Sequence, residues 1–569
     1  MRRARTDLLI LGSGGAGLFA ALHAKRARPD LGVTVAVKGL LGKCGCTRMV
    51  QGGYNVALAP GDSVERHFMD TIEGGKWLPD QELAWTLVTK AVERIHELEN
   101  ELGCFFDRNP DGTVHQKAFA GQTFDRTVHK GDLTGIEIIN RLAEQVWVAG
   151  VERLEEHRAI ELVKSADGAI AGVAMIDMRE GELVFVQARA VLLATGGGPT
   201  MYRYHTPSGD KSCDGLAMAL RAGLTLRDME MVQFHPTGLL AGAGTRMTGT
   251  VLEEGLRGAG GYLLNGAHER FMAGYDPRAE RATRDIVSRA IFSEMRSGRS
   301  TPNGGVYLAM AHLGPAEVRR QFKGMVERCA DCGFNLAGGL VEVVPTAHYM
   351  MGGVEFAADG STAVAGLFAA GEDTGGVHGA NRLGGNGVAN STVFGAIAGD
   401  TMAEWAARES AWREPEAGAL EEAAARARRP LRQPPGNLDE IRESLYGLMW
   451  EDAGIVRDEA SLKRALASLE GLRERLHTIG IHGDDLRYNL TWHDWLNLDS
   501  LVAVSAAICT AALGRTDSRG AHFRADHPQA GDLAHSAFSR VRMEGGKLDL
   551  SWQAVQFTRV RPGESLVAA

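Results

Sequence analysis

A glycine-rich segment at residues 366–400 contains two side chains suited to chemistry, Arg382 and His378. Glycines at this density let a backbone approach a ligand closely. The apolar periodicity from about Val388 predicts a helix, whose first N–H groups are free to bind an anion. The guanidinium fork of Arg382 can bind two oxygens at once, which suits a carboxylate or a phosphate. The alternative is a solvated loop arginine, and the segment alone does not decide between the two.

Residues 6–38 predict the strand, turn and helix of a dinucleotide-binding unit. A strand is expected at 8–11, the glycine turn is Gly12-Ser-Gly14-Gly-Ala-Gly17, and a helix over 16–28 leads to a strand at 33–37. These glycines let the turn close and let the backbone approach a pyrophosphate. Lys38 stands where a ribose-binding Asp or Glu is usual, which argues against simple NAD binding. A later strand, 190–194, is followed by Thr195-Gly196-Gly197-Gly198, which is typical of flavoproteins with a two-part dinucleotide domain.

The composition excludes several classes of protein. A chain of 569 residues is long enough for two to four domains. Its net charge of −9 argues against nucleic-acid binding. The odd number of cysteines, seven, favours reduced thiols and a cytoplasmic location. The N-terminal arginines and short apolar run do not make a convincing signal peptide, and the apolar stretch 501–513 is too short to span a membrane.

Two cysteine pairs have spacings that could suit a metal or redox site. Cys44-x-Cys46 and Cys329-x-x-Cys332 both lack the further spaced Cys or His residues that a zinc site requires. The second pair is also expected on a charged helix. We therefore predict structural roles for both pairs and no metal site.

The pattern of the chain changes twice. Charged helices and short loops fill residues 239–340, as expected of an inserted capping domain. Beyond a proline-rich linker at 430–435, amphipathic helices are expected at about 437–450, 458–477 and 499–513.

An ordered set of motifs resembles the flavoprotein of the succinate dehydrogenase, fumarate reductase and L-aspartate oxidase superfamily. The matches appear in family order from residue 8 to beyond 520. They are Gly12–Gly17, Gln51-Gly-Gly-Tyr-Asn-Val-Ala-Leu58, Gln233-Phe-His-Pro-Thr-Gly238, 254–265, Arg284-Asp-Ile-Val-Ser-Arg289, 345–353, Gly379-Ala-Asn-Arg-Leu-Gly-Gly-Asn386 and Ser518-Arg-Gly-Ala-His522.

The resemblance implies an α/β fold. A Rossmann-like FAD-binding domain would comprise residues 1–238 and 343–410, with an inserted α+β capping domain at 239–342 and a mainly helical C-terminal domain at 411–569. FAD would be bound by residues that match the family's cofactor positions. These are Gly12, Gly14, Gly15, Ala16, Gly17, Lys38, Cys46, Thr47, Gln51, Gly52, Gly53, Ala194, Thr195, Gly196, Asp214, Glu372, Asn386, Gly387 and Val388.

The chemistry implied by the resemblance is hydride transfer between flavin N5 and a carbon of a (di)carboxylate, with proton transfer at the neighbouring carbon. Arg284 matches the family's proton donor, and Glu254 and Arg257 match its relay. A free guanidinium keeps its proton to above about pH 12, so this role requires flanking cations and a proton pathway. The residues expected at the substrate are His235, His348, Arg382, Phe119 and Glu253.

Three positions depart from the family pattern. Glu253 replaces a threonine that helps to hold a substrate carboxylate, so it would repel a dicarboxylate unless it is protonated or turned away. Cys46 replaces the histidine that carries covalent flavin, which makes non-covalent FAD the expectation and a thioether to Cys46 the alternative. Ile136 replaces a histidine that usually follows Asp132-Leu-Thr-Gly135.

Three functions follow from these observations. The first is the catalytic subunit of a fumarate reductase or succinate dehydrogenase complex, which passes electrons to an iron–sulfur partner and lies on a membrane only through partners. The second is a stand-alone oxidase similar to L-aspartate oxidase, which uses oxygen or fumarate. The third, a non-catalytic FAD-binding subunit, is disfavoured because both Arg284 and Arg382 are present.

Overall fold

The computed structural model describes residues 1–569 except 243, 244, 246, 410, 568 and 569. Its largest sheet has seven strands in the order β6-β2-β1-β9-β8-β7, and β16 also pairs with β9. The strands are β1 (Arg2–Leu11), β2 (Val33–Val37), β6 (Glu152–Glu155), β7 (His157–Lys164), β8 (Ile170–Asp177), β9 (Glu182–Leu193) and β16 (Leu367–Ala369).

The parallel part of this sheet brings distant glycine turns to one edge. Strand β1 pairs in parallel with β2 and β9, and β16 pairs in parallel with β9. Leu11 and Ala369 are both in register with Leu193, so the carboxyl ends of the three strands coincide. In parallel sheets ligands bind beyond this edge.

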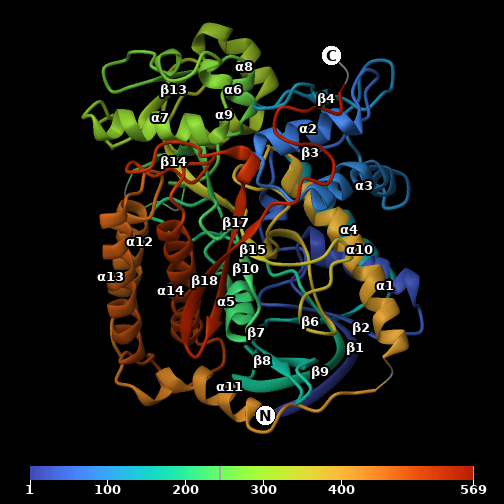
Figure 1. Cartoon of the computed structure of the whole chain (residues 1–569). Helices are drawn as coiled ribbons and strands as arrows, with labels where there is room; N and C mark the ends of the chain where they lie inside the picture. The colour runs from blue at the N-terminus through green and yellow to red at the C-terminus, as the bar shows by residue number, and fades with distance from the viewer. Residues whose placement is uncertain (243–244, 246, 410, 568–569) are drawn as a thin grey trace.

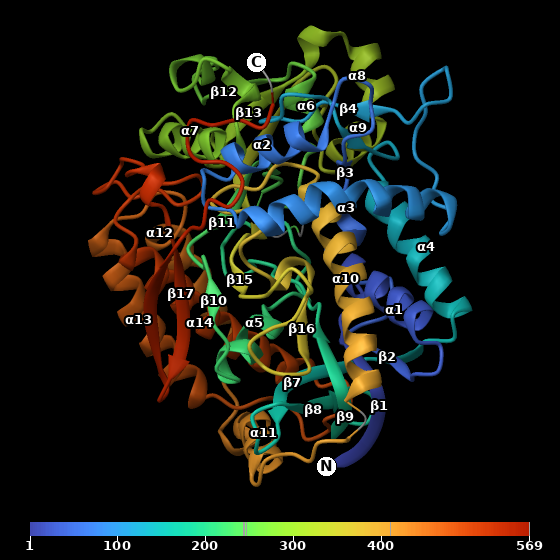
Figure 2. The ribbon, with the colours of Figure 1, turned by 45° about the vertical axis from the view of Figure 1, so that its right-hand side comes forward.

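Two helices pack against each other beside the sheet (Figures 1 and 2), α1 (Gly15–Ala27) and α10 (Asn386–Arg408). A Cβ at Gly395 would lie 2.6 Å from the Ala16 carbonyl oxygen, and one at Gly399 would lie 2.4 Å from that of Ala20. The glycines therefore let the two helix backbones approach each other closely. This contact fixes the N-terminus of α10 beside that of α1.

A second sheet and four helices lie at the top of Figure 1. The sheet is antiparallel and has the order β11-β14-β13-β12. Its hydrophobic core draws only on residues from Leu239 to Val343, so this part of the chain buries its own apolar side chains. The elements are β11 (Val232–Leu239), β12 (Tyr262–Leu264), β13 (Val306–Ala309), β14 (Leu340–Met350), α6 (Gly255–Gly258), α7 (Arg284–Arg296), α8 (Pro315–Gln321) and α9 (Lys323–Asp331).

The C-terminal part contains three long helices, α12 (Leu438–Asp452), α13 (Glu459–His477) and α14 (Leu490–Gly514). They are followed by the hairpin of β17 (Ala537–Glu544) and β18 (Lys547–Ala554), which lies along α14 (Figure 2). Strand β17 also pairs with β10 (Leu226–Arg227), which pairs with β15 (Gly353–Val354). The hairpin thus joins the C-terminal segment to the rest of the protein.

Helix α14 corrects two predictions. It begins at Leu490 rather than near residue 499, and it is apolar around most of its circumference rather than amphipathic. By length and composition it is apolar enough to cross a membrane, but 67% of its most apolar window is buried within the protein. Trp492 and Trp495 are both fully buried. These features are those of a core helix.

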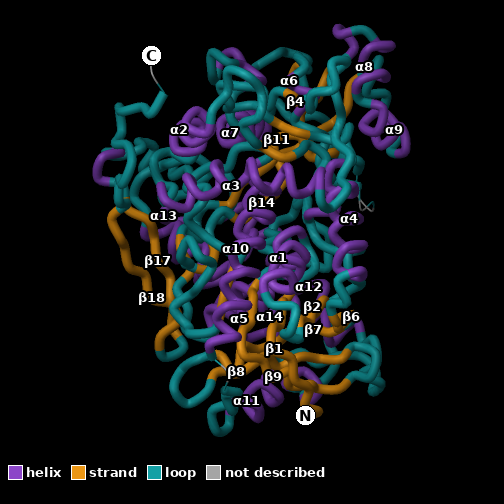
Figure 3. Tube along the Cα trace, turned by 90° about the vertical axis from the view of Figure 1, so that its right-hand side faces the viewer, coloured by secondary structure: helices purple, strands orange, loops and turns teal. Residues whose placement is uncertain are grey.

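The remaining elements are β3 (Tyr54–Asn55), β4 (Gln116–Lys117) and β5 (Thr127–Val128), which form a small sheet, and the helices α2 (Val64–Gly74), α3 (Gln81–Asn100), α4 (Thr134–Val148), α5 (Asp214–Arg221) and α11 (Ala419–Ala427). Figure 3 shows them among the other parts, with α5 in the interior beside α14.

Candidate active site

A cavity of about 340 Å³ extends from the edge of the large sheet to the α6–α7 region. It is lined by most of the residues that were predicted from the sequence to contact FAD and the substrate. From the FAD set these are Gly12, Gly14, Gly15, Ala16, Lys38, Cys46, Thr47, Gln51, Gly52, Gly53, Ala194, Thr195, Gly196, Asp214, Glu372, Gly387 and Val388. From the substrate and catalytic sets these are Phe119, His235, Glu253, Glu254, Arg284, His348 and Arg382.

The first glycine turn is closed too tightly for any other residue. Gly12 has φ +110°, and a Cβ there would lie 2.1 Å from the Ala194 carbonyl oxygen. A Cβ at Gly17 would lie 2.0 Å from the Gly12 carbonyl oxygen. Gly17 itself does not line the cavity, but its missing side chain allows the turn that does. The backbone N–H of Gly15 donates to Thr47 Oγ1 over 3.0 Å, which joins the turn to the Cys46 loop.

A buried charge cluster lies at the sheet end of the cavity. The ammonium of Lys38 lies 2.9 Å from one carboxylate oxygen of Asp214, and Arg158 donates to the other over 2.8 Å. Burial opposes the charge on Asp214, but Arg158 and Lys38 outweigh it and hold the pKa of this carboxyl well below its usual range. Asp214 is also the first residue of α5, where a negative charge is favoured.

The middle of the cavity contains Glu372, Cys46 and Lys211. Glu372 accepts from the backbone N–H of Met350 (3.0 Å) and of Gly198 (3.2 Å), and burial raises its pKa to about 7. Burial raises the pKa of the Cys46 thiol to about 12, so the thiol is protonated and not a ready nucleophile. Lys211 was not predicted from the sequence, but it lines the cavity and donates to the Thr195 carbonyl oxygen over 3.0 Å.

These walls fit FAD. The N-termini of α1 and α10 both face the cavity, through Gly14–Ala16 and Gly387–Val388, and each offers backbone N–H groups to an anion. Gln51 also lines the cavity, and its buried Oε1 has no hydrogen-bond partner among the described residues. A long polar ligand such as FAD would satisfy these groups.

A chain of buried charges starts at Arg284. Its guanidinium makes two contacts with Glu254 Oε2, at 2.7 and 3.1 Å, and donates to Gln233 Oε1 over 3.0 Å. Arg257 donates to the other oxygen of Glu254 over 3.1 Å and to the Glu280 carbonyl oxygen over 2.7 Å. Arg257 does not line the cavity but stands behind Glu254. Gln233 was not among the predicted site residues, although it lies two residues before His235.

Arg382 is buried and lacks an ionic partner. Its side chain makes no ion pair among the described residues, and its Nε has no hydrogen-bond partner there. The guanidinium carbon lies 4.4 Å from the centre of the Tyr349 ring. Burial and the nearby Arg284 lower the pKa of Arg382 to about 10, so it stays charged at neutral pH. A buried, unpaired guanidinium is strongly unfavourable unless a ligand supplies an anion.

Two histidines flank this guanidinium. The rings of His235 and His348 are 5.4 Å apart between their centres. Burial and the nearby Arg284 hold the pKa of each well below its usual value, so both rings are neutral. His235 Nδ1 accepts from the Thr237 backbone N–H over 3.3 Å, which leaves the proton on Nε2. A neutral histidine of this tautomer can donate a hydrogen bond to a substrate oxygen.

Glu253 lines the cavity but is paired. Its Oε1 accepts from the ammonium of Lys117, a residue that was not among the predicted site residues. Lys117, from β4, therefore reduces the repulsion that Glu253 would exert on a dicarboxylate substrate.

Two residues of the 366–400 segment lie behind the cavity. The side chain of Asn386 is hydrogen-bonded to Asn55 and to His67, both at 2.9 Å, so it supports the loop instead of lining the cavity. His378 is buried against Tyr349, 3.4 Å from its hydroxyl, and it does not line the cavity. We therefore assign His378 to the support of the loop.

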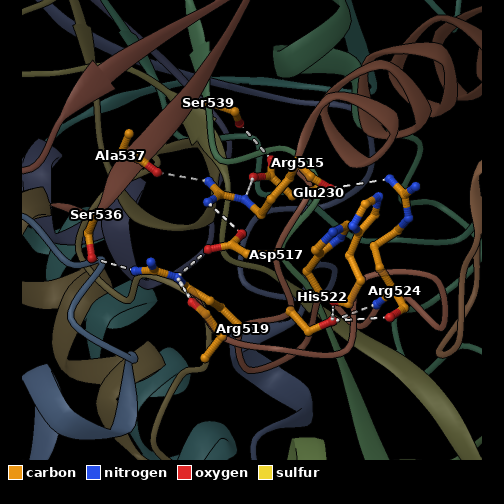
Figure 4. A network of polar contacts seen from close by, with 12 residues as sticks. Glu230, Arg515, Asp517, Arg519, His522, Arg524, Ser536, Ala537 and Ser539 are labelled. Carbon is orange, nitrogen blue, oxygen red and sulfur yellow. Dashed lines mark hydrogen bonds and ion pairs between the residues drawn. The ribbon is translucent and has the colours of Figure 1, made fainter. Parts of the chain in front are cut away.

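The motif 518–522 supports both site arginines from outside. The Ala521 backbone N–H donates to the Ala380 carbonyl oxygen over 2.8 Å, and Arg289 donates to the Gly520 carbonyl oxygen over 2.7 Å. The motif thus contacts the loop of Arg382 and the helix of Arg284. It belongs to a buried polar network (Figure 4) in which Arg515 contacts Glu230 at 2.6 Å.

Comparison with known proteins places this geometry in a family. The family described as "FAD binding domain" matches residues 7–388, and "Fumarate reductase flavoprotein C-term" matches residues 442–566. This chain belongs to the fumarate reductase and succinate dehydrogenase flavoprotein family. Its predicted α/β fold class and its predicted cofactor, FAD, are confirmed.

Relatives cover nearly the whole chain. One subunit of the fumarate reductase (CoM/CoB) of Methanothermobacter marburgensis is 40% identical over 526 residues, which are 92% of this chain and 94% of that protein. The fumarate reductase flavoprotein subunit of Escherichia coli is 36% identical over 549 residues, covering 92% and 89%. The solved structure of a variant of Escherichia coli quinol fumarate reductase superimposes with a TM-score of 0.93 at 33% identity and covers 99% of both chains.

Proposed function

We propose that this flavoprotein interconverts a dicarboxylate and its unsaturated counterpart, of the succinate and fumarate type. The observation that carries the proposal is the buried Arg382 guanidinium, which has no ionic partner among the described residues and opens onto the cavity beside two neutral histidines. Bound FAD supplies the hydride chemistry, and the residues of the chain supply substrate orientation and proton transfer.

At the α6–α7 end of the cavity, the net positive charge of the buried side chains matches the charge of a dianion. Three guanidiniums, those of Arg257, Arg284 and Arg382, face a single carboxylate, Glu254. The histidines are neutral, and Lys117 and Glu253 cancel each other. Two positive charges are therefore left among these buried groups, where the effective dielectric constant is low, and Arg328, which is half-buried, adds a further cation at the wall. A dicarboxylate would neutralise the two buried charges.

Arg284 is suited to proton transfer at the substrate carbon. Its guanidinium lines the cavity on one side and contacts Glu254 on the other, so a proton lost to the substrate can be replaced through Glu254, which takes up one proton for each that it gives. Arg257 contacts the other oxygen of Glu254 over 3.1 Å and can return a proton to it, and the Arg257 guanidinium is held in place by the Glu280 carbonyl oxygen. The buried series of Arg284, Glu254 and Arg257 supports the proposal that Arg284 is the acid, because it places a proton carrier directly behind that guanidinium.

We further propose that a separate iron–sulfur protein exchanges electrons with this chain. All seven cysteines are free, and no group of three or more potential metal ligands occurs among the described residues. Relatives are named as subunits, and one is an 8-methylmenaquinol:fumarate reductase flavoprotein subunit. Because quinols are dissolved in membranes, a peripheral location on the cytoplasmic face fits this assignment. The relatives favour a subunit over the stand-alone oxidase.

Two measurements test these proposals. Under anaerobic conditions, succinate should bleach the flavin absorbance or fumarate should restore it, whereas aspartate and larger enoates should be without effect. Flavin that responds to none of the dicarboxylates would refute the proposed reaction. Purification from the native host should recover an iron–sulfur protein with the chain, and isolation of a fully active chain alone, reoxidised rapidly by oxygen, would support the oxidase instead.

A further inference from the structure

The Lys117–Glu253 pair stands out because it joins two distant segments at the wall of the substrate cavity. Glu253 lies just before α6 and is 4% exposed, and it lines the cavity. Lys117 lies on β4, 136 residues earlier, and its ammonium contacts Glu253 Oε1. The same ammonium donates to the Gly131 carbonyl oxygen over 3.3 Å. Lys117 is not among the residues that line the cavity, so it lies behind Glu253.

An isolated carboxylate at this position would oppose the binding of a dianion. It would reduce the two excess positive charges of the site to one, at short range and with little screening. The other charged neighbours do not offset it. Asp132 and Glu254 both disfavour a charge on Glu253, and Arg328, which lines the same cavity, is only half-buried and makes no ion pair with Glu253.

We propose that Lys117 is a positioning and charge-compensating residue that makes Glu253 compatible with a dicarboxylate substrate. This inference rests on the proposed function. Lys117 contributes the balancing charge and holds the Glu253 carboxylate to one side, so that the substrate meets a neutral pair. The neutral Lys117–Glu253 pair thus replaces the uncharged threonine of the family at position 253. The replacement is neutral only if both residues of the pair are present.

The inference predicts an unusual pH dependence when Lys117 is removed. Burial raises the pKa of Glu253, whereas Lys117 lowers it. Without Lys117 the pKa of Glu253 must rise further, because only the opposing groups remain. At low pH Glu253 is then protonated and neutral, and at high pH it is charged and uncompensated. Dicarboxylate binding to a Lys117→Met variant should therefore weaken as pH rises, more steeply than binding to the parent.

The experiment is a titration of the FAD-loaded protein with succinate or malonate, followed by the change in flavin absorbance. At pH 8 we expect Lys117→Met to raise Kd at least tenfold, and Glu253→Gln to lower Kd, because it leaves the positive charge of Lys117 uncompensated. The double variant Lys117→Met/Glu253→Gln should bind within threefold of the parent, because it carries no uncompensated charge. At pH 6 the Lys117→Met defect should shrink. The defect should appear in KM and leave kcat within threefold.

The control is Lys130→Met, which removes a lysine from the same segment that pairs with Asp107 instead of Glu253. It should bind as the parent does. Equal binding by Lys117→Met and the parent, or a double variant as weak as Lys117→Met, would overturn the inference. A parent protein that binds no dicarboxylate would instead refute the proposed function. If Lys117→Met fails to fold, Glu253→Gln and the double variant provide the test: Glu253→Gln must bind the dicarboxylate more tightly than the parent, and the double variant must return to the parental affinity.

Discussion

At the scale of single residues, the site is defined by which charges have partners within the protein and which do not. Arg284 and Arg257 share Glu254, whereas Arg382 has no carboxylate partner among the described residues. A paired guanidinium keeps its position without substrate, which suits a group that must return to the same place after each proton transfer. An unpaired guanidinium has its full charge available to a ligand. These differences favour the distinct roles that we propose for the two arginines of the cavity.

We predict that the Arg284→Ala variant retains FAD but turns over at least about 10³-fold more slowly than the parent. A loss of this size is expected when a general acid is removed. Arg284 contacts Glu254 and Gln233 at the substrate end, whereas the FAD-side residues lie elsewhere in the cavity. Flavin content and steady-state fumarate reduction measure the two effects. Arg296→Ala, on the exposed end of the same helix, is the control. Near-parental turnover in Arg284→Ala would refute the proton-transfer role.

We predict that Arg382→Met weakens dicarboxylate binding about 100-fold, or about 3 kcal/mol, because it removes the charge-assisted hydrogen bonds to one carboxylate. The measurement is the Kd of succinate from flavin difference spectra. Arg408→Met changes an exposed residue at the far end of α10, the helix that follows Arg382, and should have no effect. Unchanged affinity in Arg382→Met would show that the substrate lies elsewhere in the cavity.

At the scale of elements, two long-range contacts orient the site side chains. The glycine face of α10 packs on α1 and fixes the N-terminus that follows Arg382. The 515–526 segment contacts both the Arg382 loop and α7, and it is anchored by the network around Arg515. Arg515 contacts the buried carboxylates of Glu230 and Asp228, at 2.6 and 3.6 Å.

We predict that Arg515→Met lowers the free energy of unfolding by about 3–5 kcal/mol, because it leaves the buried carboxylate of Glu230 without its cation, whereas Asp228 keeps its ion pair with Arg227 at 3.2 Å. Burial already raises the pKa of Asp228 to about 6 with Arg515 present. Arg487→Met removes an exposed pair with Asp485 and should cost less than about 1 kcal/mol. Chemical denaturation measures both. A loss as small as that of Arg487→Met would mean that the network does not anchor the segment.

At the scale of the whole molecule, many histidines are buried in a neutral form. Burial is the first cause that lowers each of their pKa values, to about 3 in His67 and His493 and to about 4 in His129. The other histidines with lowered pKa values are His205, His235, His348, His378 and His522. In the unfolded chain these rings bind protons below about pH 6.5.

We predict that stability falls as pH decreases from 6.5 to 5. In this range the unfolded state binds more protons than the folded state at these histidines, and each such proton changes the free energy of unfolding by about 1.4 kcal/mol per pH unit. Asp228, Glu372 and Asp373, with pKa values raised to about 6, 7 and 6, act in the opposite direction but are fewer. The Tm of the FAD-loaded protein should fall by more than about 5 °C between pH 7 and pH 5. His493→Gln should reduce this slope, and a Tm that is constant or higher at pH 5 would contradict the prediction.

The features of this protein that depend on local chemistry could be predicted from its sequence. Gly17 predicts the dinucleotide turn because the constraint that requires it, a close approach to the Gly12 carbonyl oxygen, lies within one short segment, whereas the approach of Gly12 to Ala194 appears only in the fold. The ordered motifs indicated the family, and most of the residues predicted from them line the cavity. The helix predicted at 499–513 is too short because the sequence before it mixes tryptophans with polar residues, and only packing shows that these tryptophans are buried.

Which charges face each other depends on the tertiary fold. Glu253 considered alone implies repulsion of a dicarboxylate, and its partner Lys117 cannot be predicted from spacing because the two are 136 residues apart. Lys211 and Gln233 could not be predicted for the same reason, since a side chain becomes part of a site only when separate segments meet. In a buried site the electrostatic energy depends on distances of a few ångströms. The sequence lists the charges, and the fold determines which of them cancel.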